Sequence, residues 1–421
     1  MWETLRDVWR VPELRKKVLY TFFMLLIFRL VSVIPAPGID VATVQSAMSN
    51  YDMLGLVNMM TGNSFSQMTI MAMGISPYIN ASIIMQLLTI AIPALERLQK
   101  DGGEEGKKKI NRITRYVTVG LAALQAIGII AGLGAIKSSY KNFFGYVTIG
   151  IIMAGGTALA MWIGERITKN GIGNGISLLI FAGIISNLFN GIVTTITGIF
   201  NGTATVGNLV VILLTTLIIL VVVTFVDMAE RRIPVMYAKR VVGRKMYGGQ
   251  STHIPLKLLS VGVLPLIFAY SFMAFPGTIF AMFGTHSGAY QWWQANMNQT
   301  SFWYMLVCAL LIIAFSYFYT SITFNPEEIA KNVQQQGGHI PGIRTGSKTV
   351  EFLKRTSNRL TLFAALFLAI LSTIPSVLTV WQQVQIPFGA SSILIAVSVA
   401  IETVRQVESQ LVMRNYKGFL G

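Results

Sequence analysis

Long uninterrupted apolar runs constrain this chain more than any other feature of its sequence. Leu209 to Phe225 contains no charged residue, and several other runs nearly match it. Of the 421 residues 53% are hydrophobic and only 12% are charged, whereas soluble domains carry roughly 25% charged residues. Runs of this length are buried most simply by the hydrocarbon core of a bilayer. The sequence therefore predicts an all-α polytopic membrane protein.

Ten segments are apolar enough to span a bilayer, which takes about 20 helical residues. Five would form an N-terminal half, 18–198, and five a C-terminal half, 199–408. Because each half crosses an odd number of times, the second half must enter the membrane inverted, although any ten-span chain divides this way. Inverted halves often build a path along their interface. The predicted spans are 18–34, 75–92, 116–136, 146–164, 176–197, 207–228, 257–279, 302–324, 358–381 and 389–407.

Positive charge lies almost entirely on one predicted side of the membrane. Of the 33 Lys and Arg residues, only Lys137 and Lys141 fall on the other side, and Arg29 falls inside the first span. Since basic loops stay in the cytosol, we expect both termini there, in a multi-pass protein of the plasma membrane. The segment 1–17 has the pattern of an interfacial amphipathic helix, and 409–421 would be a cytosolic tail.

The side chains needed for catalysis or metal binding are scarce. One cysteine excludes a disulfide framework, and three scattered histidines give no metal-ligand spacing. No phosphate-binding loop or nucleophile–base pair is present, so we expect no catalytic residues, no metal, no cofactor and no enzyme. The main alternative is a secondary transporter of a small solute with inverted repeats. Such a transporter should carry several intramembrane ionisable residues, where this chain has little besides Arg29.

The segment between the first two spans has an unusual composition. Ile34-Pro35-Ala36-Pro37-Gly38 ends the first helix, and no Lys or Arg follows before the second span. Met53 to Met60 is apolar but too short to span, and Gly62-Asn63-Ser64 breaks it. Two interpretations stay open: a re-entrant piece held in a protein-lined cavity, or a helix lying on the membrane surface.

Small residues recur in the third and fourth spans, where they would let helix backbones approach closely. In the fourth span they are Gly150, Ala154, Gly155, Gly156 and Ala158. We interpret most of them as packing positions.

Two basic loops, 229–257 and 325–359, are too long to be simple connectors. In the first, basic and apolar residues alternate on both sides of Gly243, which predicts a β-hairpin. In the second, glycine and proline predict turns that present Arg344 outward. Binding of anionic lipid explains the charge but not the length, so a docking surface for a large acidic partner is favoured, either ribosomal RNA or an acidic protein. The candidate docking residues are Arg240, Arg244, Lys245, Arg344 and Lys348.

Seven motifs, in order along the whole chain, resemble those of the SecY family of bacterial protein-conducting channels. They are Ile34-Pro35-Ala36-Pro37-Gly38-Ile39-Asp40, Gly74-Ile75-Ser76-Pro77-Tyr78-Ile79, Gly173-Asn174-Gly175-Ile176-Ser177, Tyr237-Ala238-Lys239-Arg240, Gln250-Ser251-Thr252-His253-Ile254-Pro255-Leu256-Lys257, Pro341-Gly342-Ile343-Arg344 and Gln410-Leu411-Val412-Met413-Arg414. The chain departs from the family pattern at Ser76 and Thr345, where methionine and proline are usual.

The resemblance implies an hourglass pore between the two halves, with three sets of working residues. A ring of apolar side chains would close the waist, and i, i+4 pairs on one helix face suit such a ring. A plug helix, about 53–67, would fill the outer funnel, and a lateral gate would open toward lipid. The ring would be Ile75, Ile79, Ile180, Ile184, Ile267 and Ile395; the plug Met53, Leu54, Leu56, Val57, Met59 and Met60; and the gate Asn80, Gln86 and Phe275.

The same resemblance implies what the chain does and with which partners. It would be a passive, gated channel that passes unfolded secretory proteins and releases transmembrane segments into lipid. Expected partners are small membrane subunits resembling SecE and SecG, the SecA motor ATPase, the ribosome, signal sequences with their unfolded polypeptides, and anionic lipids.

Overall fold

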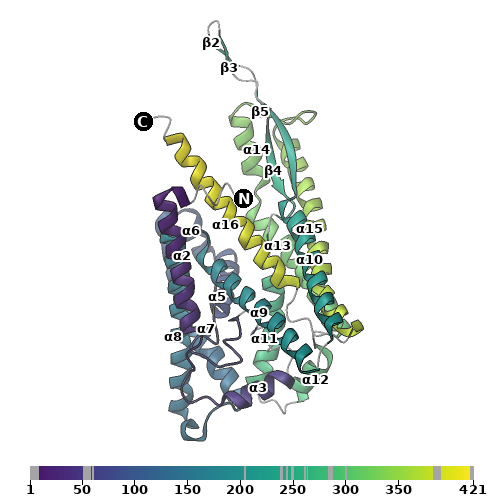
Figure 1. Ribbon diagram of the computed structural model, residues 1–421. Coiled ribbons are helices and arrows are strands. Elements are labelled where there is room, and N and C mark those ends of the chain that lie inside the picture. The colour runs from purple at the N-terminus through teal and green to yellow at the C-terminus, as the bar shows by residue number, and fades with distance from the viewer. Residues whose placement is uncertain are drawn as a thin grey trace.

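Helices make up most of the described chain, as the computed structural model in Figure 1 shows. The structure describes residues 9–50, 58, 61–202, 205–237, 240–242, 245–247, 251–259, 262, 264–282, 288–298, 301–382 and 390–417.

Each of the ten predicted spans overlaps one long helix. In the N-terminal half these are α2 (Pro12–Val31), α5 (Ser76–Ala91), α7 (Gly103–Leu133), α8 (Phe143–Asn170) and α9 (Gly175–Phe200). In the C-terminal half they are α10 (Val206–Met228), α11 (Leu264–Met282), α13 (Phe302–Thr323), α15 (Ser347–Gln382) and α16 (Ala390–Lys417). Shorter helices connect them: α3 (Val41–Asn50), α6 (Pro93–Lys100), η1 (Ser138–Tyr140), α12 (Gly288–Asn296) and α14 (Pro326–Gln335).

Six helices of the described part are long and apolar enough to cross a membrane, which confirms the polytopic membrane class. A seventh crossing results if α5 and α6, which are bent by 104° at a short break, count as one span. Pro93 follows the break, and a proline cannot continue the preceding helix without losing a hydrogen bond. The full number of ten crossings stays a prediction.

Several helices extend well beyond the predicted spans. α7 begins at Gly103 with Glu104 and Glu105 in its first turn, where the helix dipole favours acidic side chains. α15 begins at Ser347, and α16 continues to Lys417, so the segments predicted as connector or tail there are helical. The differences arise because charged residues are incompatible with hydrocarbon but compatible with a helix in water.

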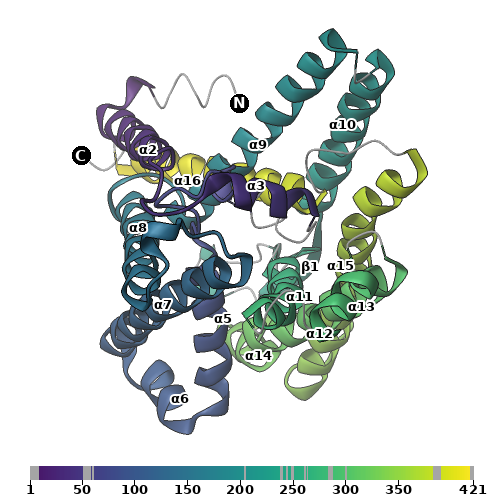
Figure 2. The same cartoon turned by 90° about the horizontal axis from the view of Figure 1, so that it is seen from below.

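The two halves lie side by side, and α16 crosses from beside α2 toward the other half (Figure 2). α2, α7 and α8 lie in one half, and α11, α13 and α15 in the other. Each half has its own buried cluster, one around Phe65 and Ile130, the other around Ile312 and Leu394. A third cluster joins residues of α2, α8 and α9 to residues of α11 and α16, and so connects the halves.

Thr61–Gly74, called here the turn segment, is a compact series of turns buried in protein. Phe65 and Met68 have no exposed surface. The Ala36 amide donates to the Met68 carbonyl at 2.9 Å, and the Ile70 amide donates to the Ile34 carbonyl at 2.9 Å. Both interpretations given for the apolar piece concern Met53 to Met60, of which only Asn58 is described, so they stay predictions. The plug candidates Met53, Leu54, Leu56, Val57, Met59 and Met60 lie outside the described residues.

The two long basic loops form one small β-structure. β1 (Glu230–Tyr237) pairs antiparallel with β4 (Ser251–Lys257), and β2 (Arg240–Val242) pairs with β3 (Lys245–Tyr247) beyond them, so the predicted hairpin is confirmed. β5 (Gly338–His339), from the second loop, adds to β1. Beneath lie the buried side chains of Ile233, Val235, Leu256, Ala330, Val333, Ile340 and Leu353. We call this unit the loop platform; the sequence did not predict that both loops would share it.

The close approach of α8 to the turn segment generates a stability prediction. A Cβ added at Gly156 would lie 2.0 Å from the Ile70 carbonyl oxygen, whereas one added at Gly155 meets nothing within 4 Å. Alanine is favoured over glycine in helices by about 1 kcal/mol, but overpacking costs roughly 1–3 kcal/mol. Gly156→Ala is therefore expected to lower the melting temperature of the detergent-solubilised chain, and Gly155→Ala to leave it unchanged or raise it. Equal melting temperatures would contradict the close packing.

Candidate functional site

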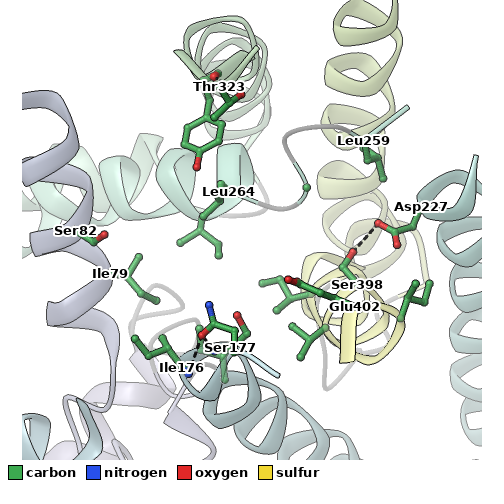
Figure 3. A pocket seen from close by; sticks show the side chains of 18 of the residues that line it. Ile79, Ser82, Ile176, Ser177, Asp227, Leu259, Leu264, Thr323, Ser398 and Glu402 are labelled. Atoms are coloured by element: carbon green, nitrogen blue, oxygen red, sulfur yellow. Dashed lines mark hydrogen bonds between the residues drawn. The ribbon is translucent and has the colours of Figure 1, made fainter. Parts of the chain in front are cut away.

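A large cavity lies between the two halves, on the side of the loop platform. Its volume is about 930 Å³. Its walls come from α5 and α9 in the N-terminal half and from α10, α11, α13 and α16 in the C-terminal half. Figure 3 shows Ile79 and Ser82 facing Leu264, Ser398 and Glu402 across it. The cavity therefore sits at the interface where a path was expected.

The predicted ring isoleucines lie at the apolar end of this cavity. Ile79, Ile180, Ile267 and Ile395 line it. All six belong to one larger packed cluster, and of the six every isoleucine except the half-buried Ile79 is at most 8% exposed. We call the six the isoleucine cluster; its members are Ile75, Ile79, Ile180, Ile184, Ile267 and Ile395.

A small void lies beyond the isoleucine cluster. Its volume is about 10 Å³, close to the space that one water molecule needs. Ile79 and Ile180 line both the void and the large cavity, so these side chains separate the two spaces. On the other side of the void lie Thr61 and Gly74, from the turn segment. Most of the lining of the void is apolar: Phe28, Ile75, Ile79, Leu179 and Ile180.

Local structure fixes where the isoleucines point. The Asn174 side chain accepts hydrogen bonds from the Ile176 and Ser177 amides, which caps the first turn of α9. Gly173 precedes it with φ of +79°, a conformation that glycine adopts readily. From this start, Ile180 and Ile184 fall on the face of α9 that meets the cavity end. On α5, Ile79, Ser82, Ile83 and Gln86 share one face in the same way.

Polar and charged side chains also line the cavity. Asp227 at the end of α10 accepts a hydrogen bond of 3.0 Å from the Ser398 hydroxyl of α16 (Figure 3). Glu402 and Arg405 continue this side along α16. The sequence analysis assigned neither Asp227 nor Glu402 to a site. The signal available was that both lie at the same predicted end of their spans.

The predicted gate residues lie on two helices that contact each other, α5 and α11. Asn80 is half-buried, and Gln86 is exposed and lines the cavity. Phe275 lies in α11, but its side chain is outside the described part. α11 packs more extensively against α7 than against α5. The seam thus includes α7, which the sequence analysis did not name.

The predicted docking residues lie on the loop platform and beside it. Arg344 and Lys348 are exposed, in and after a turn that contains Gly342 and Gly346 at positive φ. A hydrogen bond from Lys348, 2.9 Å long, holds the pKa of Glu351 below its usual value. Arg240 and Lys245 belong to β2 and β3, with side chains outside the described part, and Arg244 lies outside it altogether.

Groups that could hold a metal ion are absent from the described residues: no cluster of three His, Cys, Asp or Glu side chains occurs there. The cavity between the halves ends on aliphatic side chains, which offer no group for covalent or acid–base chemistry. What the arrangement can do is pass or block material according to the separation of its walls.

Comparison with known proteins agrees on one family. A family model of SecY matches residues 69–404. Curated relatives named protein translocase subunit SecY include that of Streptomyces galbus, 42% identical over 98% of both chains, and that of Halalkalibacterium halodurans, 42% identical over 100% of both. The relative from Corynebacterium glutamicum is 41% identical over 97% of both chains.

Solved structures share the fold. One described as a protein-conducting channel has a TM-score of 0.69 at 19% identity and covers 96% of each chain. Sec61 from a canine ribosome–channel complex has a TM-score of 0.64 at 18% identity, again over 96% of each chain. With matching sequence over the full length and a matching fold, the chain belongs to the SecY family of protein translocase subunits, which are channels rather than enzymes.

Proposed function

We propose that this chain is a passive, gated channel for unfolded polypeptides. The observation that carries the proposal is the cavity of about 930 Å³ that both halves line and that ends on the isoleucine cluster. The family supports the same function, since its members are named translocase subunits. In this proposal the cavity is the cytosolic funnel and the isoleucine cluster is the ring at the waist.

An aliphatic ring suits a polymer of changing chemistry. Fixed charges or hydrogen-bonding groups would retain some segments of a translocating chain, whereas branched aliphatic walls bind no segment strongly. The empty constriction excludes ions because a narrow apolar space loses its water. The polar residues Asp227, Glu402 and Arg405 stay in the wide part, where water shields them from the passing chain.

The lateral gate is proposed along the seam of α5 and α7 with α11. Asn80 and Gln86 on α5 belong to it, with Phe275 on α11. Interhelical hydrogen bonds in membranes are worth only about 1 kcal/mol each, so such a seam can hold at rest and still open. An apolar signal sequence would then enter lipid, driven by roughly 25 cal/mol per Å² of buried apolar surface.

The energy for transport would come from partners on the loop platform. We propose that Arg240, Arg244, Lys245, Arg344 and Lys348 bind the SecA motor or the ribosome. A ribosome-bound Sec61 shares the fold, which supports the second partner. Small subunits resembling SecE and SecG would flank the halves, and anionic lipids would bind the basic loops.

The charge distribution supports a bacterial plasma membrane location with both termini in the cytosol. Residues 53–67 are proposed as the plug.

Crosslinking during translocation tests the proposed path directly. A photoreactive residue at Ile79 or Ile267, in the isoleucine cluster, is expected to crosslink to a secretory polypeptide stalled in transit. The same probe at Ile84, exposed at the outer surface of α5, should not. A small solute competing at Ile79, with no polypeptide product, would instead support a transporter.

The seal made by the isoleucine cluster gives a conductance prediction. Ile184 is 3% exposed and its neighbour Ile185 is 44% exposed on the same helix. Ile79→Gly with Ile184→Gly is expected to raise the resting ion conductance of the reconstituted chain, because a wider constriction stays wet. Ile84→Gly with Ile185→Gly should leave the resting ion conductance unchanged. This control makes the same Ile→Gly change once in α5 and once in α9, so it lowers the helix propensity of both helices equally. Equal currents in planar bilayers would remove the ring from the proposal.

The loop platform gives a prediction about docking. Arg344→Glu is expected to slow motor-driven translocation roughly tenfold, the effect of losing about 1.4 kcal/mol of binding. Resting conductance should not change, since Arg344 is exposed and lies outside the cavity lining. Lys141→Glu makes the same charge change at an exposed residue on the opposite face and serves as the control. Uptake of a secretory protein into vesicles measures both; normal uptake by Arg344→Glu would contradict the docking role.

A further inference from the structure

Arg29 is a charged residue inside the first predicted span, and the proposed function so far gives it no role. It follows Phe28 in α2, whose side chain belongs to the same buried cluster as the six isoleucines and lines the small void. Arg29 itself is half-buried. A guanidinium stays protonated in proteins, and its N–H groups need acceptors when they leave water. The hydrogen-bond acceptors of Arg29 therefore identify the segments of the chain that it connects.

The two terminal nitrogens of Arg29 bind backbone carbonyls from two different parts of the chain. Nη1 donates to the Gly62 carbonyl at 3.3 Å, in the turn segment. Nη2 donates to the Ala182 carbonyl, in α9. Among the described residues no carboxylate pairs with Arg29. The planar fork of one side chain thus joins the turn segment to α9.

The turn segment is shaped to receive the guanidinium. Gly62 has φ of +66° and Asn63 has φ of +70°, two successive left-handed residues. A Cβ on Gly62 would lie 2.6 Å from Nη1 and 2.8 Å from Nη2 of Arg29. Any larger residue at position 62 would displace the guanidinium. Glycine is needed here both for the backbone conformation and for the contact.

The attachment point on α9 lies beside the constriction. Ala182 sits between Ile180 and Ile184 of the isoleucine cluster. A second hydrogen bond from α9 reaches Asn58, which precedes the turn segment: the Asn187 side-chain amide donates to the Asn58 carbonyl at 3.3 Å. The Asn58 side chain in turn accepts from the Ser66 amide of the turn segment at 2.9 Å. Thr61 and Gly74 of the turn segment face Ile180 across the small void. The position of the turn segment on α9 therefore decides how much space remains behind the isoleucines.

We propose that Arg29 is a positioning residue that fastens the turn segment to α9 and keeps the resting path closed. The proposal rests on the proposed function, because it assigns a role to the closed state of that channel. Only arginine supplies two divergent donors in one rigid plane. A lysine at the same place offers a single point charge and would bind one carbonyl at a time.

The test measures resting ion current through the full chain in planar bilayers. Arg29→Met keeps an unbranched apolar side chain and removes both hydrogen bonds, each of which, made by a charged donor, shifts an equilibrium about tenfold or more. Its resting current is expected to rise at least about tenfold over that of the unchanged chain. Arg29→Lys is expected to leak to an intermediate degree. Arg15→Met removes one charge from an exposed residue of the same helix and should stay closed.

A second pair of variants keeps the test decisive if Arg29→Met does not fold. Gly62→Ala pushes the guanidinium away and is expected to leak. Gly134→Ala introduces alanine at a similar left-handed position, φ of +62°, where the new Cβ meets nothing within 4 Å. It controls for backbone strain and should stay closed.

The outcomes separate this proposal from the proposed function. In one outcome the unchanged chain transports a secretory protein while Arg29→Met and Gly62→Ala show the same resting current as their controls. That result overturns the fastening role and leaves the proposed channel function intact. If Arg29→Met leaks while the unchanged chain passes no polypeptide, the channel function fails and the fastening role stands.

Discussion

Among the described residues, the isoleucine cluster joins the two halves through apolar side chains, and the proposed channel depends on that contact. Dispersion and water exclusion are non-directional, so isoleucines from α5, α9, α11 and α16 can separate and repack without breaking a specific bond. A constriction closed by hydrogen bonds or ion pairs would be more stable when shut. Each opening would, however, leave hydrogen-bond donors and acceptors without partners. The cost of opening is thus spread over many weak contacts.

Polar interactions lie mostly outside the isoleucine cluster, where they stabilise local parts of the fold. Asn174 caps α9, the Ser398 hydroxyl binds Asp227 in the wide part of the cavity, and the loop platform has its own small core. Arg29 is the exception, since its charge lies close to the isoleucines. Its acceptors are backbone carbonyls, which carry no net charge and do not titrate. Polar contacts thus stabilise the separate parts of the molecule, and the isoleucine cluster is the contact that opens in the proposed channel.

Hydropathy and charge predicted the membrane class and the helix positions, because the bilayer imposes a strong and simple rule on composition. The ends of α7, α15 and α16 were missed, since water permits a helix to continue with charged residues. The six isoleucines could be named only through family motifs; nothing in an isolated Ile267 distinguishes a pore wall from lipid contact. Partnerships across the chain, such as β5 with β1 or Arg29 with Gly62 and Ala182, depend on folding and have no local signature.

Helix α16 carries Ile395 near one end and continues as a single rod of 28 residues, about 42 Å long, to Lys417. Between these ends it contacts α2, where the Lys17 ammonium donates a hydrogen bond of 3.2 Å to the Gln410 side-chain oxygen. Because α16 is one continuous helix, a tilt of its Lys417 end would also displace Ile395. A partner that bound and tilted that end would therefore, in the proposed channel, move one wall of the isoleucine cluster.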